Sequence, residues 1–290
     1  FIKKIISYYR LVMKNIPFIK MHGLGNDFIL FDFTKKTAKL TKKNIINLAD
    51  RNKGVGCDQV IIMLRAKHKK NDVMVEIYNN DGSRVYTCGN AMRCVAFILK
   101  SKLRKKNINI ETTKNVIKNI VNSKSAITSN MSAPKFSWKE IPLSRKMNTK
   151  KLNINLRNTA LKNPSTVNMG NPHMVFFTKN INKINLKKIG PKLERHNFFP
   201  KKCNVSIAQK TSENSIKLKV WERGAGETLA CGSAACATTV VAINKKIVKK
   251  RKVNITMPGG KLKVEWNKAN NVLMTGPAQM AFTGFVKIEN

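Results

Sequence analysis

The pattern of hydrophobic positions predicts two short helices that are apolar on every side. Residues 95–99 and 237–242 are almost entirely hydrophobic, so neither segment has a polar face to turn toward water. Both runs are far shorter than the roughly 18 apolar residues of a membrane-spanning helix. We therefore predict two buried helices, and each opens at a cysteine that is followed by glycine, Cys88-Gly89 and Cys231-Gly232.

Strand patterns appear in the same order before each cysteine. The first series is strand, glycine turn and strand at 18–32, a helix at 41–51, and strands at 60–64 and 73–78. The second series is strand, turn and strand at 166–177, a helix at 184–195, and strands at 203–208 and 215–221. More strands are predicted after each helix, at 108–112, 116–128, 253–257, 261–266 and 279–288. This order predicts a protein built from two similar halves.

Polar residues also recur in register between the halves. The spacing is 143 residues for Cys88/Cys231 and Asn79/Glu222, and 145 residues for Gln59/Asn204 and Asn26/Asn171. We expect two such halves to place one cysteine on each side of a shared cleft. That geometry would move a proton from one face of a carbon atom to the other.

A cysteine at the start of a helix has distinctive chemistry. The first backbone N–H groups of a helix lack intrahelical partners and carry the positive end of its dipole. A thiolate or a bound carboxylate is stabilised there, and the pKa of the thiol can be lowered. A single Cys-Gly pair could equally be a buried, inert cysteine. The duplication of the pair favours a functional role.

Size and composition define the broad class of protein. A chain of 290 residues with 42% hydrophobic content suits two domains of about 130 to 150 residues. The net charge of +41 would ordinarily indicate nucleic acid or an anionic membrane surface. Here the lysines are scattered among asparagine and isoleucine along the whole chain. This distribution favours compositional drift, rather than a nucleic-acid-binding surface, as the origin of the charge. The six cysteines show no Cys-x-x-Cys spacing, which argues against a zinc site and favours a reducing cytoplasm.

Five motifs in order resemble those of the diaminopimelate epimerase family. They are Met21–Phe28, Asp81–Ser83 with Cys88–Asn90, Met169–His173, Glu222–Thr228 with Ala230–Ser233, and Met274–Ala278. The resemblance implies an α/β (α+β) fold of two pseudo-symmetric domains, each a curved, mostly antiparallel sheet wrapped around a central helix. The expected division is a basic N-terminal extension at 1–16, an N-terminal domain at 17–132 plus 277–290, and a C-terminal domain at 133–276.

The resemblance also implies a reaction, the interconversion of LL- and meso-diaminopimelate for lysine and peptidoglycan precursors, with no cofactor and no metal. Cys88 and Cys231 would be the acid and the base, and His173 and Glu222 match positions that assist catalysis. The residues that match substrate-binding positions are Asn26, Gln59, Asn79, Gly89, Asn90, Asn171, Asn204, Glu222, Arg223, Gly232 and Ser233. One departure is Ala91, which stands where the family commonly has glycine. Within a helix we expect this change to be tolerated.

Two other functions fit parts of the sequence. A two-thiol racemase of proline or hydroxyproline is disfavoured by Arg223 and the asparagines, because a cyclic monocarboxylate has no distal charged centre for them to bind. A basic nucleic-acid-binding protein that had lost catalysis would not need both thiols. We therefore expect diaminopimelate as the partner, no specific nucleic acid, no membrane, and a cytoplasmic homodimer.

Overall fold

The computed structural model describes residues 14–35, 39–86, 88–156, 159 and 161–288, which form two compact units. The first contains the described residues up to Gly23, Asp27–Lys124, and those from Ala278 onward. The second contains Leu24–Asn26 and Ser125–Pro277. The sequence placed this boundary after residue 132, but β8 (Ala126–Asn130) counts with the second unit because it pairs with β16 (Val272–Gly276). Most of the extension expected at 1–16 lies outside the described residues.

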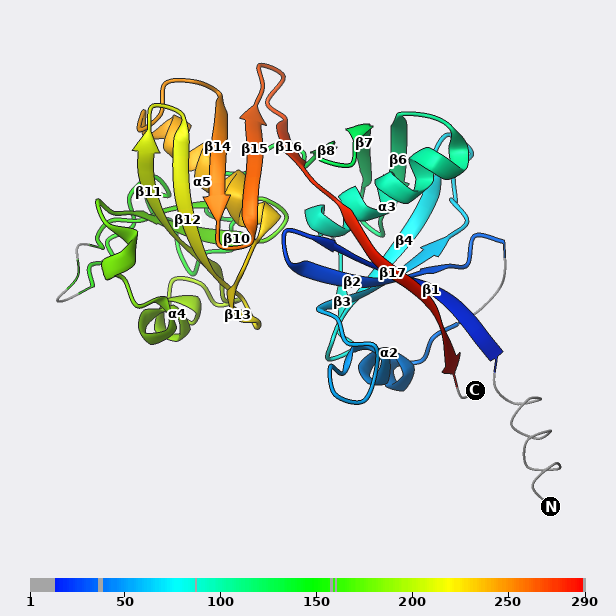
Figure 1. The fold of residues 1–290 in the computed structure, drawn as a ribbon. Helices are drawn as coiled ribbons and strands as arrows, with labels where there is room; N and C mark the ends of the chain where they lie inside the picture. Colours follow the sequence, from blue (N-terminus) through cyan, green and yellow to red (C-terminus); the bar gives the residue numbers. More distant parts are fainter. Residues whose placement is uncertain (1–13, 36–38, 87, 157–158, 160, 289–290) are drawn as a thin grey trace. The chain divides into compact units, whose positions relative to one another are not determined.

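The first unit has one helix enclosed by a sheet. Its elements are β1 (Lys14–Gly23), β2 (Asn26–Asp32), α2 (Lys42–Ala49), β3 (Gln59–Leu64), β4 (Val73–Asn79), β5 (Arg84–Val85), α3 (Gly89–Leu103), β6 (Asn107–Glu111), β7 (Val116–Ser123) and β17 (Gln279–Ile288). The strands pair in the order β17-β1-β2-β3-β4-β6-β7, and only β2–β3 and β4–β6 are parallel among the described registers. The last strand, red in Figure 1, lies beside β1, as the resemblance implied.

The second unit repeats this plan. Its other elements are β9 (Ser165–Asn168), β10 (Pro172–Phe177), the 3₁₀ turn η1 (Ile181–Lys183), α4 (Leu186–Glu194), β11 (Asn204–Ser212), β12 (Ser215–Glu222), β13 (Gly226–Thr228), α5 (Gly232–Asn244), β14 (Lys252–Met257) and β15 (Gly260–Trp266). The order is β9-β10-β11-β12-β14-β15-β16-β8, and its parallel pairs β10–β11 and β12–β14 correspond to the parallel pairs of the first unit. The repeat and the fold predicted from the sequence are confirmed.

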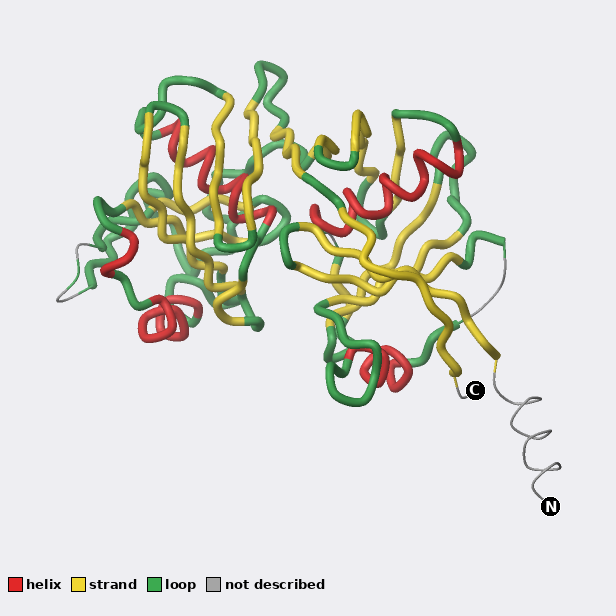
Figure 2. Tube along the Cα trace, viewed as in Figure 1, coloured by secondary structure: helices red, strands yellow, loops and turns green. Residues whose placement is uncertain are grey.

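The two helices predicted to be buried are the cores of their units. In Figure 2 each lies among the strands of its own unit, α3 against β1, β6 and β7, and α5 against six strands of the second sheet. Residues 234–242 of α5 are all buried. Since burial of a valine-sized side chain stabilises a fold by about 1.5–3 kcal/mol, this helix is held by apolar packing on all sides. No helix among the described residues is long and apolar enough to cross a membrane.

Charged groups join the start of β2 to the start of β3. The Asp27 carboxylate accepts hydrogen bonds at 2.7 Å from Arg51 Nη2 and from Lys20 Nζ. The backbone N–H of Asp27 donates to Asp58 Oδ2 at 3.1 Å, and that of Asp58 donates to Asp27 Oδ1 at 2.9 Å. Burial by itself raises the pKa of Asp27, but the bonds from Arg51 and Lys20 outweigh it and lower the pKa to about 2.

This cluster should set the acid stability of the first unit. Because the Asp27 pKa is about 2 in the fold and about 3.9 unfolded, ionised Asp27 stabilises the fold above pH 4, and the effect is lost as the pH falls toward 2. We expect Asp27→Asn to lower the free energy of unfolding at pH 7 by about 1–3 kcal/mol. The unfolding free energy of the variant should also depend less steeply on pH between pH 4 and 2. Urea unfolding at pH 7, 4 and 3 measures both quantities. The same decrease in unfolding free energy from pH 7 to pH 3 in the variant and the wild type would refute the prediction.

Candidate active site

Each unit places a cysteine at the N-cap of its central helix. Cys88 precedes α3 and is partly exposed, whereas Cys231 precedes α5 and is buried. Neither thiol makes a side-chain capping hydrogen bond in the part of the chain that the structure describes. The other two α-helices of the described chain are capped conventionally, by the side chains of Thr41 and Asn185. The amides at the starts of α3 and α5 are therefore the ones suited to an anionic ligand.

Cys231 lies in an environment that keeps it protonated. Burial raises its pKa well above the ordinary value, and the Glu222 carboxylate raises it further through its charge and a hydrogen bond. The hydroxyl of Thr228 donates to Glu222 Oε1 at 2.6 Å, which fixes that carboxylate. Ser233 Oγ lies 3.4 Å from Cys231 Sγ. Burial and the neighbouring Glu222 carboxylate thus both favour the thiol form of Cys231.

His173 is a neutral, fully buried imidazole. Its Nε2 lies 2.8 Å from Asn171 Oδ1. Because an amide oxygen only accepts, Nε2 carries the proton and Nδ1 keeps a lone pair. Burial lowers the pKa of His173 to about 3, and the charge of Arg223 acts in the same direction. His173 can therefore accept a hydrogen bond at neutral pH, but it cannot supply a positive charge.

Arg223 belongs to the same polar network of the second unit. Its backbone N–H donates to Asn204 Oδ1 at 2.9 Å, and its Nη1 donates to the carbonyl of Lys201 at 3.1 Å. The Asn204 amide in turn donates to the carbonyl of Pro172, next to His173, at 3.2 Å. The second unit thus brings together the predicted residues Asn171, His173, Asn204, Glu222, Arg223, Cys231, Gly232 and Ser233.

The first unit contains a smaller, uncharged set of predicted residues, of which two are in contact. Gln59 Nε2 donates to Asn79 Oδ1 at 3.0 Å across the β3–β4 pair. Gly89 and Asn90 are the first residues of α3, directly after Cys88. Asn26 begins β2, at the hairpin tip that counts with the second unit. The shared cleft between the halves stays a prediction.

Some residues of these networks were not predicted from the sequence. Arg93 is fully buried in α3 and donates to Asn90 Oδ1 at 2.9 Å. Its spacing of three residues from Asn90 places both on one helix face, which is the clue that could have identified it. Thr228, which bonds Glu222, closes the Glu222–Thr228 motif but was not singled out within it. Glu194, which bonds Trp221 and Gly224 on either side of Glu222 and Arg223, has no comparable clue. Ala91 is buried inside α3, at a position where a helix favours alanine over glycine.

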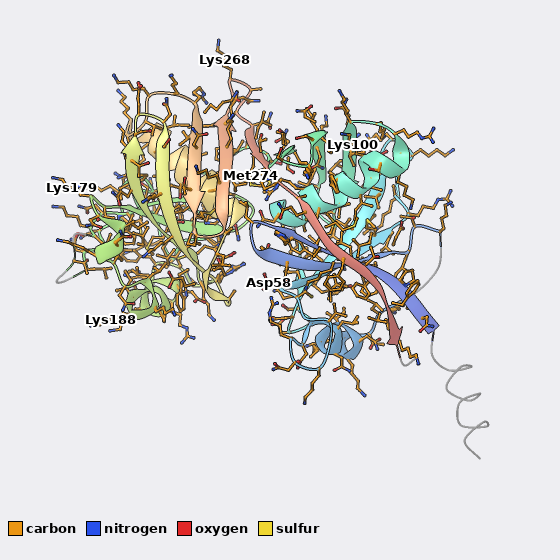
Figure 3. All side chains as sticks on the ribbon, viewed as in Figure 1. Asp58, Lys100, Lys179, Lys188, Lys268 and Met274 are labelled. Atoms are coloured by element: carbon orange, nitrogen blue, oxygen red, sulfur yellow. The ribbon has the colours of Figure 1, made fainter. Side chains whose placement is uncertain are left out.

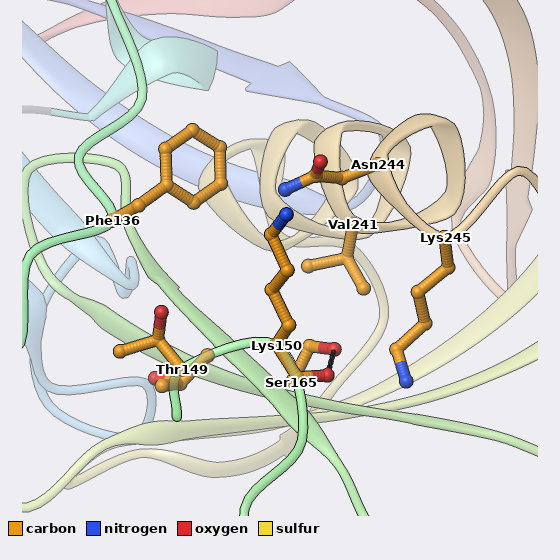
Figure 4. Close-up of a pocket in the computed structure, with 8 residues that line it drawn as sticks. Phe136, Thr149, Lys150, Ser165, Val241, Asn244 and Lys245 are labelled. Carbon is orange, nitrogen blue, oxygen red and sulfur yellow. Dashed lines mark hydrogen bonds between the residues drawn. The ribbon is translucent and has the colours of Figure 1, made fainter. Parts of the chain in front are cut away.

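A pocket in the second unit lies away from these residues. It is at the C-terminal end of α5 (Figure 4) and is lined by Phe136, Thr149, Lys150, Ser165, Thr166, Val241, Asn244 and Lys245. Cys231 is at the other end of this helix, about 15–20 Å away at a rise of 1.5 Å per residue. The pocket is therefore separate from the predicted catalytic residues.

Positive charge is distributed over the surface of both units. In Figure 3, Lys100 projects from the first unit and Lys179, Lys188 and Lys268 from the second. They belong to four different segments, so they mark no single binding motif. Among the described residues, no group of three or more His, Cys, Asp or Glu side chains is arranged to hold a metal ion.

The fold defines the class of this protein. A hydroxyproline epimerase from Agrobacterium vitis has the same fold, with a TM-score of 0.68 over 95% of this chain and 93% of that chain. The two sequences are only 12% identical, so the likeness establishes the fold alone. The chain thus has the diaminopimelate epimerase-like fold that the resemblance implied.

Sequence comparison defines the particular family. The profile of the diaminopimelate epimerase family matches residues 18–137 and 165–281. The diaminopimelate epimerase of Wolbachia sp. subsp. Drosophila simulans is 44% identical over 260 residues, which are 89% of this chain and 95% of that protein. The one from Rhodospirillum centenum is 39% identical over 92% of this chain and 91% of that protein. This chain belongs to the diaminopimelate epimerase family, which is a family of isomerases.

The buried imidazole should leave a signature in the pH dependence of stability. The His173 pKa is about 3 in the fold and about 6.5 unfolded, so below pH 6.5 only the unfolded chain gains this proton, and stability falls. We expect His173→Gln to reduce the slope of unfolding free energy against pH, between pH 6 and 4, by up to about 1.4 kcal/mol per pH unit. Denaturant unfolding measures the slope. An NMR titration in which the His173 ring protonates between pH 5 and 8 would contradict this.

Proposed function

We propose that this protein interconverts LL- and meso-diaminopimelate without a cofactor, using Cys88 and Cys231 as acid and base. The observation that carries the proposal is the thiol at the N-terminus of the buried central helix in each of two equivalent units. Membership of the diaminopimelate epimerase family supports the substrate. In the cell the reaction would serve lysine and peptidoglycan precursor synthesis, in a reducing cytoplasm that keeps the thiols available.

The reaction has to break an ordinary α-C–H bond. One thiolate takes the α-proton, the electron pair of that bond passes into the adjacent carboxylate, and the other thiol protonates the opposite face of the carbon. The backbone N–H groups at Gly89, Asn90, Gly232 and Ser233 are suited to stabilise the growing charge on the carboxylate. By analogy with oxyanion holes, one such donor contributes on the order of 3 kcal/mol.

The surroundings of Cys231 support unequal roles for the two thiols. Because its pKa is raised, Cys231 begins as the proton donor, and Cys88 is the base in that direction. The reverse direction starts from the opposite protonation state, in which Cys231 takes the α-proton as a thiolate and Cys88, as a thiol, protonates the other face of the carbon. When that state forms from the resting one, Cys88 gains a proton from solvent and Glu222 receives the proton of Cys231. Neutral His173 would accept a hydrogen bond and so assist a thiol or orient the reacting amine.

The remaining predicted residues would bind the substrate. The planar guanidinium of Arg223 suits the distal carboxylate, because it can donate two parallel hydrogen bonds. The amides of Asn26, Gln59, Asn79, Asn171 and Asn204 would hold its amino and carboxylate groups. A cyclic amino acid with one carboxylate would leave Arg223 without a partner. This is why we favour diaminopimelate over proline or hydroxyproline.

Deuterium exchange tests the reaction directly. In deuterated water the wild type should incorporate deuterium at the α-carbon of LL-diaminopimelate, and Cys88→Ala or Cys231→Ala should lower the rate by about 10²- to 10⁴-fold because each loses an acid or base. Cys236→Ala is the matched control. It replaces a buried cysteine inside α5, five residues after Cys231, and the variant should retain activity. Absence of exchange by the wild type at every pH from 7 to 9 would remove the proposed function.

We also propose that the protein is a homodimer. Strand β17 exposes a row of apolar side chains: the exposed fraction is 49% for Met280 and 72% for Phe285. An apolar strand of this kind is a surface that a second copy can cover. We expect the double change Met280→Lys with Phe285→Lys to produce a monomer in sedimentation velocity, because the lysines would be buried against each other. Ile120→Lys, an exposed apolar position on β7, is the control, and a monomeric wild type would refute the assignment.

A further inference from the structure

A buried carboxylate at the end of α4 joins the two sides of the Glu222–Arg223 segment. Glu194 is only 5% exposed. Its Oε2 accepts a hydrogen bond from Trp221 Nε1 at 2.7 Å, and its Oε1 accepts one from the backbone N–H of Gly224 at 3.1 Å. One donor immediately precedes Glu222 and the other immediately follows Arg223. We call this pair of bonds the Glu194 clamp.

The packing around the clamp leaves little freedom. A Cβ atom on Gly190, one turn earlier in α4, would lie 2.4 Å from Trp221 Cδ2, so only glycine allows the indole ring to sit there. Gly224 and Gly226 have backbone φ angles of 78° and 84°, which residues other than glycine rarely adopt. The ring is therefore fixed against α4, and the turn between β12 and β13 follows one tight path.

The clamp has no equivalent in the first unit. The position 145 residues before Glu194 is Ala49, the last residue of α2, which has no hydrogen-bonding side chain. The turn after Asn79 is held by its own residues, because Asn79 N donates to the carbonyl of Ser83 and Ser83 N donates to Asp81 Oδ1 at 2.8 Å. The first unit carries a neutral amide at this point, whereas the second carries an acid and a base.

We propose that Glu194 is a positioning residue, which fixes the directions of the Glu222 carboxylate and the Arg223 guanidinium by holding the backbone on both sides of them. Its catalytic consequence rests on the proposed function, in which Glu222 serves Cys231 and Arg223 binds the distal carboxylate. A carboxylate suits this place because both of its partners are donors and it has only acceptors to offer. Glutamine would turn an NH₂ group toward one of the two donors.

Glu194→Gln is the sharpest test because it keeps the size of the side chain. With Arg223 and Glu222 displaced, we expect KM for diaminopimelate to rise and kcat to fall, so that kcat/KM drops by about 10- to 100-fold. Trp221→Phe removes the indole N–H and retains a ring against Gly190. If the clamp acts through this bond, the two substitutions remove the same interaction. The kcat/KM of the double variant should then lie within about 3-fold of that of the worse single variant, and should not fall by the product of the two separate losses.

Two further readouts separate positioning from a purely structural role. Hydrogen exchange of the Gly224 amide should accelerate in Glu194→Gln, and Trp221 fluorescence should shift as the indole loses its carboxylate partner. Glu227→Gln, an exposed acid on β13 of the same turn, is the matched control and should change none of these quantities.

The outcomes that overturn the proposal are distinct. Faster Gly224 exchange with unchanged kcat and KM would show a clamp without a positioning role, and unchanged exchange would show no clamp. If the wild type catalysed no α-deuterium exchange, the proposed function would fail and the catalytic role of Glu194 with it. The exchange rate of Gly224 would still decide whether the clamp exists.

Discussion

The structure depends on how its two central helices begin. A helix start leaves backbone N–H groups unpaired, and proteins usually satisfy one of them with Ser, Thr, Asp or Asn at the N-cap. This chain uses such caps on α2 and α4, where Thr41 and Asn185 accept hydrogen bonds from the first turn. On α3 and α5 it has a cysteine instead. Replacing a good cap costs about 1 kcal/mol, and the apolar packing of both helices more than offsets that cost. The chain thus places a cysteine, rather than a conventional capping residue, at the N-terminus of each central helix.

The two units share a fold but differ in charge at equivalent positions. The first unit has neutral amides at these positions, with Gln59 bonded to Asn79. The second unit has Glu222 and Arg223 in the corresponding region, and a histidine whose pKa is lowered by burial. A repeated fold can therefore carry different charges at equivalent positions of its two halves.

The sequence predicted the architecture well, because the patterns that identify its helices and strands are local. Apolar runs without a polar face identified α3 and α5, and alternation with glycine turns identified most strands. What it missed depends on contacts between distant segments. Strand β8 joins the second unit through its pairing with β16, more than 140 residues away, and no pattern near residue 130 reveals this. Glu194 looks like any acid at the end of an amphipathic helix, until the fold brings Trp221 and Gly224 to it.

The few acidic residues of this chain show how a strongly basic sequence can keep a specific fold. Only 15 Asp and Glu accompany 56 Lys and Arg, so carboxylates are scarce. Several of them accept two or more hydrogen bonds from fixed donors: Glu111, for example, accepts from the backbone N–H groups of Lys67 and His68 and from Asn71 Nδ2 at 2.6–3.0 Å. Removing such an acid would leave buried donors unpaired, at about 1–3 kcal/mol each, whereas replacing an exposed acid costs little. Substitution of exposed residues by lysine therefore has little effect on stability. Substitution of Asp27, Glu111 or Glu194 would be destabilising, because each of these carboxylates accepts several hydrogen bonds from fixed donors.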